Sequence, residues 1–221
     1  HAVLIDKNEE LINFYRVVRD NLEELLADLR KHESTPEYYY RIRTLTPEGL
    51  TPVQRASRFL YLNKTGYNGL WRVNSKGQYN VPFGWYKKPR FLDEANLRLV
   101  SRALAQPGVH LLVGDYSLAL NYAGPGTFIY LDPPYYLPKM ARNPFYTRDR
   151  FGVKDQIRLA KIFRELDSRG CLLMMSNSDT PFIRQLYAGY DIRTVYTRYG
   201  INRLESPRRQ ISELVIRNYR N

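Results

Sequence analysis

Asp132, Pro133, Pro134 and Tyr135 are the residues of this sequence whose types and spacing most clearly suit chemistry. They follow an apolar stretch, residues 128–131, that predicts a short buried strand. Because proline fixes φ and has no N–H, strand pairing must end here with a carboxylate, an uncommitted carbonyl and an aromatic ring presented together. A primary amine on a planar base would match this group, and a strand-end turn with a surface acid is the alternative.

Two further acids follow predicted strands. Asp6 ends the apolar stretch 3–5, and Asp115 ends the stretch 110–114 and precedes Tyr116. In nucleoside-binding α/β folds an acid at such a position accepts hydrogen bonds from ribose hydroxyls. Asp6 is therefore a candidate for a ribose, and Asp115 for an adenine amine with the Tyr116 ring nearby. Either acid could instead cap a following helix.

The elements that position these acids alternate along the chain. Hydrophobic periodicity predicts strands at 3–6, 110–115, 128–132, 171–175, 192–199 and 213–218, and helices at 9–30, 52–64, 154–168 and 181–187. This order predicts an α/β fold with a mostly parallel, Rossmann-like sheet covered by helices on both faces. The last two strands have no helix between them, so we expect an antiparallel pair at the edge.

Composition narrows the class of protein. The 221 residues carry a net charge of +12 with a pI near 9.7, which favours a polyanionic partner. The single cysteine, Cys171, lies in a predicted core strand, so we expect no disulfide and a cytoplasmic setting. The three histidines are scattered, so no metal site is predicted. No apolar run reaches membrane-spanning length, and no signal peptide is recognisable.

The basic residues are concentrated in one block. Residues 49–92 contain no acid, eight Lys or Arg residues and nine aromatic residues. Interleaved cations and rings are typical of surfaces that neutralise phosphates and stack on bases. Residues 36–98 also interrupt the strand–helix alternation, and residues 70–88 carry a hairpin signal. We therefore expect an inserted helical and β-hairpin recognition subdomain at 36–98, with a catalytic core formed by 1–35 and 99–221.

Several motifs together resemble the Dam-type, D12 class DNA adenine N6-methyltransferases over nearly the whole chain. They are DPPY at 132–135, LNKTGYNGL at 62–70, NVPFG at 80–84, YKKP at 86–89, MSNSDT at 175–180 and the start of the first helix after Asp6. The resemblance implies methyl transfer from S-adenosylmethionine to adenine N6 in double-stranded DNA, at GATC. The sequence does not show the oligomeric state, and a monomer is our default expectation. The resemblance also implies that the target base is flipped out of the duplex. Asp132, which also adjoins the cofactor, and the Pro133 carbonyl would then bind the amine, while Tyr135 stacks on the base.

The same resemblance assigns roles within residues 36–98. Arg72 would contact a guanine through the major groove, which is the commonest specific pairing. Leu70 and Pro82 would touch bases, and Tyr67 would enter the stack beside Asn68. The remaining assignments are phosphate or backbone contacts by Lys64, Asn74, Lys76, Tyr86, Lys87 and Lys88, and a loop over the flipped base carrying Tyr146 and Phe151. Trp71 and Trp85 are assigned to the core, although the family often has a basic residue at position 85.

The family's first cofactor motif, a strand with a Gly-rich turn, should precede Asp6 and is not found in this sequence. We therefore expect these residues to belong to a longer protein, whose preceding part also carries a guanine-reading lysine. Two alternatives stay open. One is a catalytically inactive, sequence-specific DNA-binding protein of the same fold. The other is an amino-methyltransferase that acts on cytosine N4 or on RNA.

Overall fold

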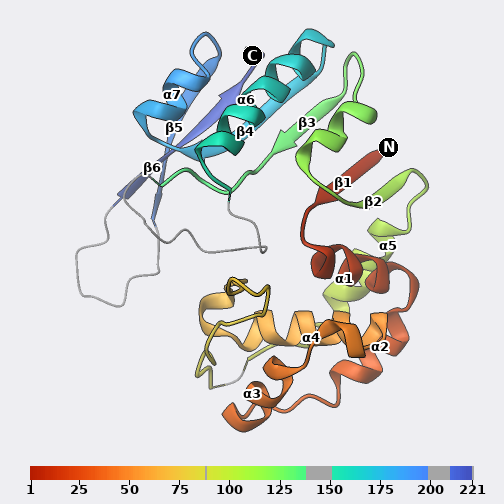
Figure 1. The fold of residues 1–221 in the computed structure, drawn as a ribbon. Helices are drawn as coiled ribbons and strands as arrows, with labels where there is room; N and C mark the ends of the chain where they lie inside the picture. Colours follow the sequence, from red (N-terminus) through yellow and green to blue (C-terminus); the bar gives the residue numbers. More distant parts are fainter. Residues whose placement is uncertain (88, 138–150, 199–209, 221) are drawn as a thin grey trace. The chain divides into compact units, whose positions relative to one another are not determined.

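The computed structural model describes residues 1–87, 89–137, 151–198 and 210–220 (Figure 1). The chain divides into two compact units. Unit 1 comprises residues 1–115, and unit 2 comprises the described residues from 116 onward. Each unit has its own sheet and its own hydrophobic core.

Unit 1 is built on a parallel pair of strands, β1 (Ala2–Asp6) and β2 (Val109–Val113). Helices α1 (Glu9–Asp20), α2 (Leu22–Leu29), α4 (Pro52–Thr65) and α5 (Glu94–Leu104) pack together next to these strands (Figure 1). Their shared core includes Ile12, Val18, Leu26, Phe59 and Leu97. Burial of these apolar side chains is the main force that holds the helices together.

The predicted helix 9–30 is two helices. The chain leaves the helical conformation at Asn21, where φ is −137°, and α2 starts at the next residue. Apolar periodicity continues across this break, so it could not reveal the change of direction. Helices α3 (Pro36–Thr44) and α5 were not predicted at all. Each has a capping side chain: Thr35 accepts from the N–H of Tyr38, and Asp93 from that of Asn96.

The predicted hairpin 70–88 contains little regular strand. Among the described residues its pairing is limited to isolated bridges, Gly66 with Phe83 and Val73 with Tyr79. The predicted turn is present: the N–H of Asn74 donates to the Gln78 carbonyl, and Gly77 has φ +80°. Two more helical turns, η1 (Pro47–Gly49) and η2 (Tyr67–Gly69), complete the connections.

The basic block is less of a surface than its composition suggests. Phe59, Tyr61, Tyr79 and Phe83 are buried, and the last three form a core cluster with Tyr39, Leu62 and Val81. Arg58 is also buried and donates to the carbonyls of Ile42 and Arg43 at the end of α3. The expectation of a stacking surface was therefore wrong for these residues. Tyr39, Tyr61 and Tyr79 are part of the core of this unit, so aromatic content alone did not mark an interface.

An ion pair ties α4 to the start of α1. Arg55 Nε donates to Glu10 Oε1 at 3.0 Å, and Arg55 Nη2 donates to Glu9 Oε1 at 2.9 Å. These acids lie in the first turn of α1, where negative charge is favourable. Arg55 is therefore a structural cation in this fold.

Unit 2 starts with η3 (Tyr116–Asn121) and contains strands β3 (Phe128–Leu131), β4 (Leu172–Ser178), β5 (Asp191–Arg198) and β6 (Gln210–Arg217). The strand order is β3-β4-β6-β5, with β3 and β4 parallel and β6 antiparallel to both its neighbours. The predicted α/β class is confirmed. The sheets contain parallel pairs, and the last two strands of the chain, β5 and β6, form the expected antiparallel pair.

Helices α6 (Val153–Ser168) and α7 (Pro181–Leu186) lie against one face of this sheet (Figure 1). Leu159, Phe163 and Ile183 pack there against Leu173 and Leu214, among others. On the other face Phe128, Tyr130 and Leu172 are exposed. The described part of unit 2 therefore has helices on one face only, whereas the alternation of strands and helices had predicted helices on both faces. No helix among the described residues is long and apolar enough to cross a membrane.

Candidate functional site

The predicted corner lies where β3 ends. Leu131 pairs with Met175 in the parallel register, so the next residues along the two strands, Asp132 and Ser176, are neighbours. Ser176 Oγ donates to Asp132 Oδ1 at 2.6 Å. The Asp132 carboxylate is exposed, and no described residue donates to the Pro133 carbonyl. An oriented carboxylate and an uncommitted carbonyl thus lie next to each other.

Buried amides support the corner from behind. Gln156 Nε2 donates to the Pro134 carbonyl at 2.9 Å, and Asn177 Nδ2 donates to Gln156 Oε1 at 3.1 Å. Asn177 Oδ1 in turn accepts from the N–H of Tyr136 at 3.3 Å. Gln156 and Asn177 are 1% and 0% exposed, so these hydrogen bonds are protected from water. This network fixes the backbone of the corner to α6 and β4.

Tyr135 is half-buried, and its hydroxyl donates to Glu213 Oε2 on β6 at 3.3 Å. Burial is the main reason that the pKa of Tyr135 is raised to about 12. The phenol is therefore neutral at physiological pH, and its ring orientation is set by the hydrogen bond at its far end.

The two predicted acids of unit 1 lie at the same edge of its sheet. Asp6 pairs with Val113, and Asp115 follows two residues later. Asp6 Oδ1 accepts from the N–H of Asn8 at 2.6 Å, while Asn8 itself caps α1. Burial raises the pKa of Asp6, and the Asn8 hydrogen bond opposes this shift. The alternative that Asp6 caps the helix is therefore wrong, because Asn8 performs that function.

Tyr116 and Phe151 contact each other in unit 2. Their rings meet edge to face with centroids 5.9 Å apart, and the Arg158 guanidinium lies over the Tyr116 ring at 5.2 Å. The Tyr116 hydroxyl donates to the Asp155 carbonyl at 3.3 Å. Tyr146 and Lys88 lie outside the described residues.

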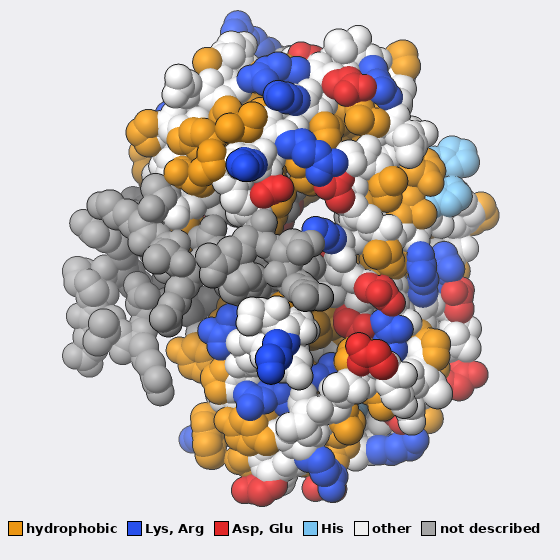
Figure 2. All heavy atoms as spheres, in the orientation of Figure 1, with side chains coloured by type: hydrophobic (Ala, Val, Ile, Leu, Met, Phe, Trp, Pro, Cys, Tyr) orange, Lys and Arg blue, Asp and Glu red, His pale blue; other side chains and the backbone are white. Residues whose placement is uncertain are grey.

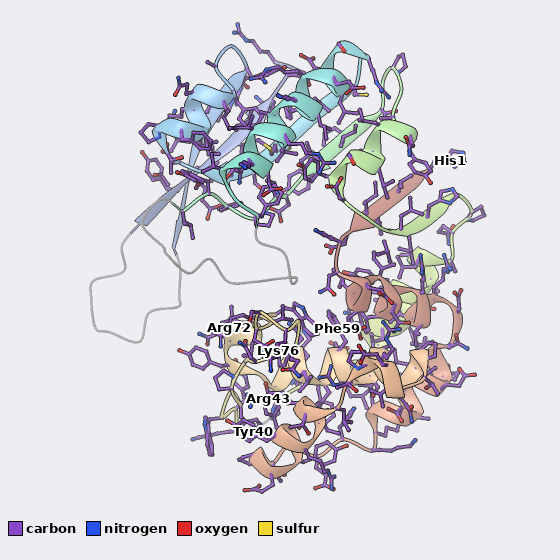
Figure 3. The ribbon with its side chains drawn as sticks, in the orientation of Figure 1. His1, Tyr40, Arg43, Phe59, Arg72 and Lys76 are labelled. Atoms are coloured by element: carbon purple, nitrogen blue, oxygen red, sulfur yellow. The ribbon has the colours of Figure 1, made fainter. Side chains whose placement is uncertain are left out.

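Arg72 has a defined orientation in unit 1. Its Nε donates to Asn80 Oδ1 at 2.7 Å and its Nη2 donates to the Asn80 carbonyl at 3.1 Å. Figure 3 shows Arg72 and Lys76 on the loop that follows α4. Lys76 is exposed at the tip of the turn that Asn74 closes, since Asn74 Oδ1 accepts from the N–H groups of Lys76 and Gln78. The Asn74 side chain is thus used by the turn itself.

The other predicted base-contacting residues lie close together along two adjoining segments. The N–H of Tyr67 donates to the Pro82 carbonyl at 2.8 Å. Asn68 is exposed with φ +55°, and Leu70 is 40% exposed. Left-handed φ is tolerated by Asn better than by most residues. The structure therefore brings Tyr67, Asn68, Leu70 and Pro82 together.

Lys64, Tyr86 and Lys87 are exposed, as a phosphate-contacting role requires. Trp71 packs against the rings of Phe59 and Tyr79, in agreement with its assignment to the core. Trp85 does not: its side chain is 74% exposed. Figure 2 shows basic side chains among hydrophobic ones on the surface of this unit.

Four polar residues of these sites were not predicted: Ser176, Gln156, Asn177 and Asn80. Two sequence signals could have identified three of them. Ser176 and Asn177 lie in the MSNSDT motif at 175–180, and Asn80 begins the NVPFG motif. Gln156 has no such signal, because only the fold brings α6 against the corner. Among the described residues no group of three His, Cys, Asp or Glu side chains could hold a metal ion.

Comparison with known proteins now identifies the class. Residues 1–201 match the family described as D12 class N6 adenine-specific DNA methyltransferase. The chain belongs to this family, and it is an adenine-specific DNA methyltransferase.

Named relatives extend over most of the chain. A type II methyltransferase of Lactococcus lactis subsp. cremoris is 38% identical over 228 positions, covering 100% of this chain and 80% of that protein. A type II methyltransferase of Methanocaldococcus jannaschii is 40% identical, covering 99% and 80%. The DNA adenine methylase of Escherichia coli is 32% identical, covering 96% and 77%.

Proposed function

We propose that this enzyme methylates adenine N6 within GATC sites of duplex DNA, using S-adenosylmethionine and acting as a monomer. We further propose that the target adenine is flipped out of the duplex before the reaction. The observation that supports this most directly is the corner after β3. There, the exposed Asp132 carboxylate is oriented by Ser176, and the Pro133 carbonyl lies next to it without a described donor.

The corner fits an adenine amine by its chemistry. The two N–H bonds of N6 need two acceptors, which Asp132 and the Pro133 carbonyl provide. Because positive charge develops on N6 as it attacks a methyl group, a fixed carboxylate stabilises the transition state more than the neutral ground state. The Ser176 hydrogen bond orients the Asp132 carboxylate, and the Gln156 hydrogen bond to the Pro134 carbonyl holds the backbone next to Pro133, before the base arrives. The amine inside a base pair is not accessible to such a corner, which is the reason to propose base flipping.

The residues of unit 1 fit the nucleoside part of the cofactor, which supplies an electrophilic methyl group when bound. Asp6 uses one carboxylate oxygen for the N–H of Asn8 and leaves the other for a ribose hydroxyl. Asp115, which follows the neighbouring parallel strand, is the proposed acceptor from an adenine amine. Tyr116, which follows Asp115 in the chain and is the first residue of unit 2, is the proposed packing partner of that ring.

Arg72 is the proposed reader of a guanine. Its Nε and Nη2 are held by Asn80, which orients the guanidinium and leaves its remaining N–H groups for a base edge. Tyr67, Asn68, Leu70 and Pro82 are the proposed contacts to the bases around the extruded adenine. The proposed contacts to the sugar–phosphate backbone of DNA are Lys64, Asn74, Lys76, Tyr86, Lys87 and Lys88.

The test uses the enzyme, cofactor labelled on its methyl group and matched duplexes. We expect label on adenine in a GATC duplex and none in a duplex whose GATC is scrambled. A 2-aminopurine placed at the target adenine should gain fluorescence on binding if the base is flipped. Label on adenine at another sequence would overturn the GATC assignment alone, and an unchanged 2-aminopurine signal would overturn base flipping alone.

The same experiment separates the alternatives. Tight GATC binding without label would indicate an inactive binding protein. Label on cytosine, or only on RNA, would indicate a different amine as substrate. Membership of a family of adenine-specific DNA methyltransferases favours adenine in DNA over cytosine and over RNA as the substrate.

A further inference from the structure

Trp85 has two unfavourable features at one position. Its side chain is 74% exposed, and its φ is +54°. A bulky residue with left-handed φ is a genuine outlier, and such strain costs roughly 1–3 kcal/mol. An exposed indole also leaves a large apolar area in water. Neither feature helps the free protein, so they suggest a function in a complex.

The loop around Trp85 is fixed by its neighbours. The N–H of Gly84 donates to the Thr65 carbonyl at 2.8 Å, and Phe83 bridges to Gly66. A Cβ atom on Gly84 would lie 2.9 Å from the Thr65 oxygen and would clash with the Tyr86 ring, so only glycine fits there. The Trp85 indole itself meets the buried Phe83 ring edge to face, with centroids 5.4 Å apart. One edge of the indole is therefore anchored while most of its surface stays open.

The surroundings of Trp85 select the chemistry of its partner. Two neighbouring segments, one after Gly66 and one after Phe83, are joined by the Gly66–Phe83 bridge. Leu70 is exposed in the first segment, and Tyr86 and Lys87 are exposed in the second, next to Trp85. Residues 49–92 contain no acid. A partner that is both anionic and able to pack against a flat apolar ring fits this surface, and the sugar–phosphate backbone of DNA has both properties.

We propose that Trp85 is a non-ionic DNA contact, in which the indole packs on a deoxyribose of the bound duplex while Lys87 binds an adjoining phosphate. This inference rests on the DNA site of the proposed function and adds a residue to it. An apolar contact releases no counterions, so its share of the affinity does not depend on salt. A lysine contact behaves in the opposite way, because it contributes to the slope of affinity against salt.

The test measures DNA affinity by anisotropy of a labelled GATC duplex at several salt concentrations. Trp85→Ala should weaken binding roughly ten-fold, by the same factor at every salt concentration. Lys87→Ala should instead lower the salt slope by about one. Tyr122→Ala, at an exposed aromatic of unit 2, is the matched control and should bind as the parent enzyme does.

Two further readouts separate function from folding. Trp85→Gly removes the left-handed strain, so its melting temperature should be at least that of the parent while its DNA affinity falls. Only Trp71 and Trp85 fluoresce as tryptophans, so a change in indole emission on DNA addition should disappear in Trp85→Phe while anisotropy still reports binding.

The failure of this inference differs from the failure of the proposed function. If Trp85→Ala binds DNA as tightly as the parent enzyme at all salt concentrations, the Trp85 contact is overturned while GATC methylation stands. If the Trp85→Ala loss shrinks as salt rises, its effect is ionic and the non-ionic contact is overturned. A parent enzyme that binds duplex DNA but does not label adenine would overturn the proposed function and leave the contact intact.

Discussion

Ser176 Oγ donates a 2.6 Å hydrogen bond to Asp132 Oδ1; Asp132 directly follows β3, and Ser176 lies within the adjacent parallel strand β4. The serine hydroxyl also accepts from Tyr130 at 3.3 Å. Because Asp132 is exposed, this contact is what limits the rotation of its carboxylate. Ser176 is therefore a positioning residue whose effect should appear in turnover rather than in DNA binding.

Replacing Ser176 tests this role. We expect Ser176→Ala to lower kcat on the order of ten-fold with KM for DNA nearly unchanged, because the carboxylate is present but less well oriented. Ser176→Thr keeps the hydroxyl and should recover most of the rate. Ser168→Ala, at an exposed serine of α6, is the control. A rise in KM without a fall in kcat would show that Ser176 acts on binding instead.

Replacing Asp132 removes the proposed electrostatic stabilisation. We expect Asp132→Ala to lower single-turnover methyl transfer on the order of a thousand-fold while DNA affinity stays within a few-fold. Asp132→Asn keeps an acceptor without the charge, so the difference between the two variants measures the field of the anion. Turnover equal to the parent in Asp132→Ala would refute the assigned role.

The buried amide network should contribute to folding as well as to the site. Gln156→Leu leaves the Pro134 carbonyl and Asn177 Nδ2 without their partner, at a cost of about 2–4 kcal/mol in the free energy of unfolding. Urea denaturation would measure it. Lys161→Ala, on the exposed side of the same helix, should change stability by less than about 0.5 kcal/mol. Equal stability of the two variants would mean that the network is not needed for folding.

The pH dependence of unit 1 should include a contribution from His32. This imidazole lies between the Tyr38 hydroxyl and Ser57 Oγ and stacks on Tyr61, and burial lowers its pKa to about 4. The unfolded chain therefore binds the proton more readily, so stability is full above about pH 6.5 and falls as the pH drops toward 4.

Solvent screening of the partly exposed ring limits this loss to the order of 1–2 kcal/mol. Unfolding of the parent and of His32→Gln, measured from pH 7 to pH 4, would isolate the contribution from that of the carboxylates. Identical slopes for the two proteins would contradict the prediction.

Arg72 and Asn80 should act as one unit in sequence recognition. Arg72→Ala should cost about 1–3 kcal/mol on the cognate duplex and relax one base position. Asn80→Ala should relax the same position, because it frees the guanidinium that it now orients. In the double variant the losses should be less than additive. Arg90→Ala, an exposed arginine of the basic block, should weaken all sequences alike.

The sequence predicted the strand-end acids because two prolines and short apolar runs are local signals. The partners of those acids are not local: Ser176 and Gln156 reach the corner only through strand register and the packing of α6. The charge and aromatic content of residues 49–92, taken together, predicted a DNA-binding surface for residues that are in fact buried. Arg58 and Tyr61 are buried structural residues, and Trp85, which was assigned to the core, is exposed. Whether a side chain faces the core or the solvent depends on tertiary packing, which the composition of a segment does not reveal.

Helix α4 connects the loop proposed to bind DNA with the start of α1, next to the acid proposed to bind the cofactor. The carbonyl of its last residue, Thr65, accepts from the N–H of Gly84 in the loop that bears the proposed DNA contacts, and near its first turn Arg55 binds Glu9 and Glu10, which follow Asp6. A helix of this length is a stiff rod. If the proposed sites are right, movement of this loop when a duplex docks would be transmitted through α4 to the turn beside Asp6, so the affinities for DNA and for the cofactor should be coupled.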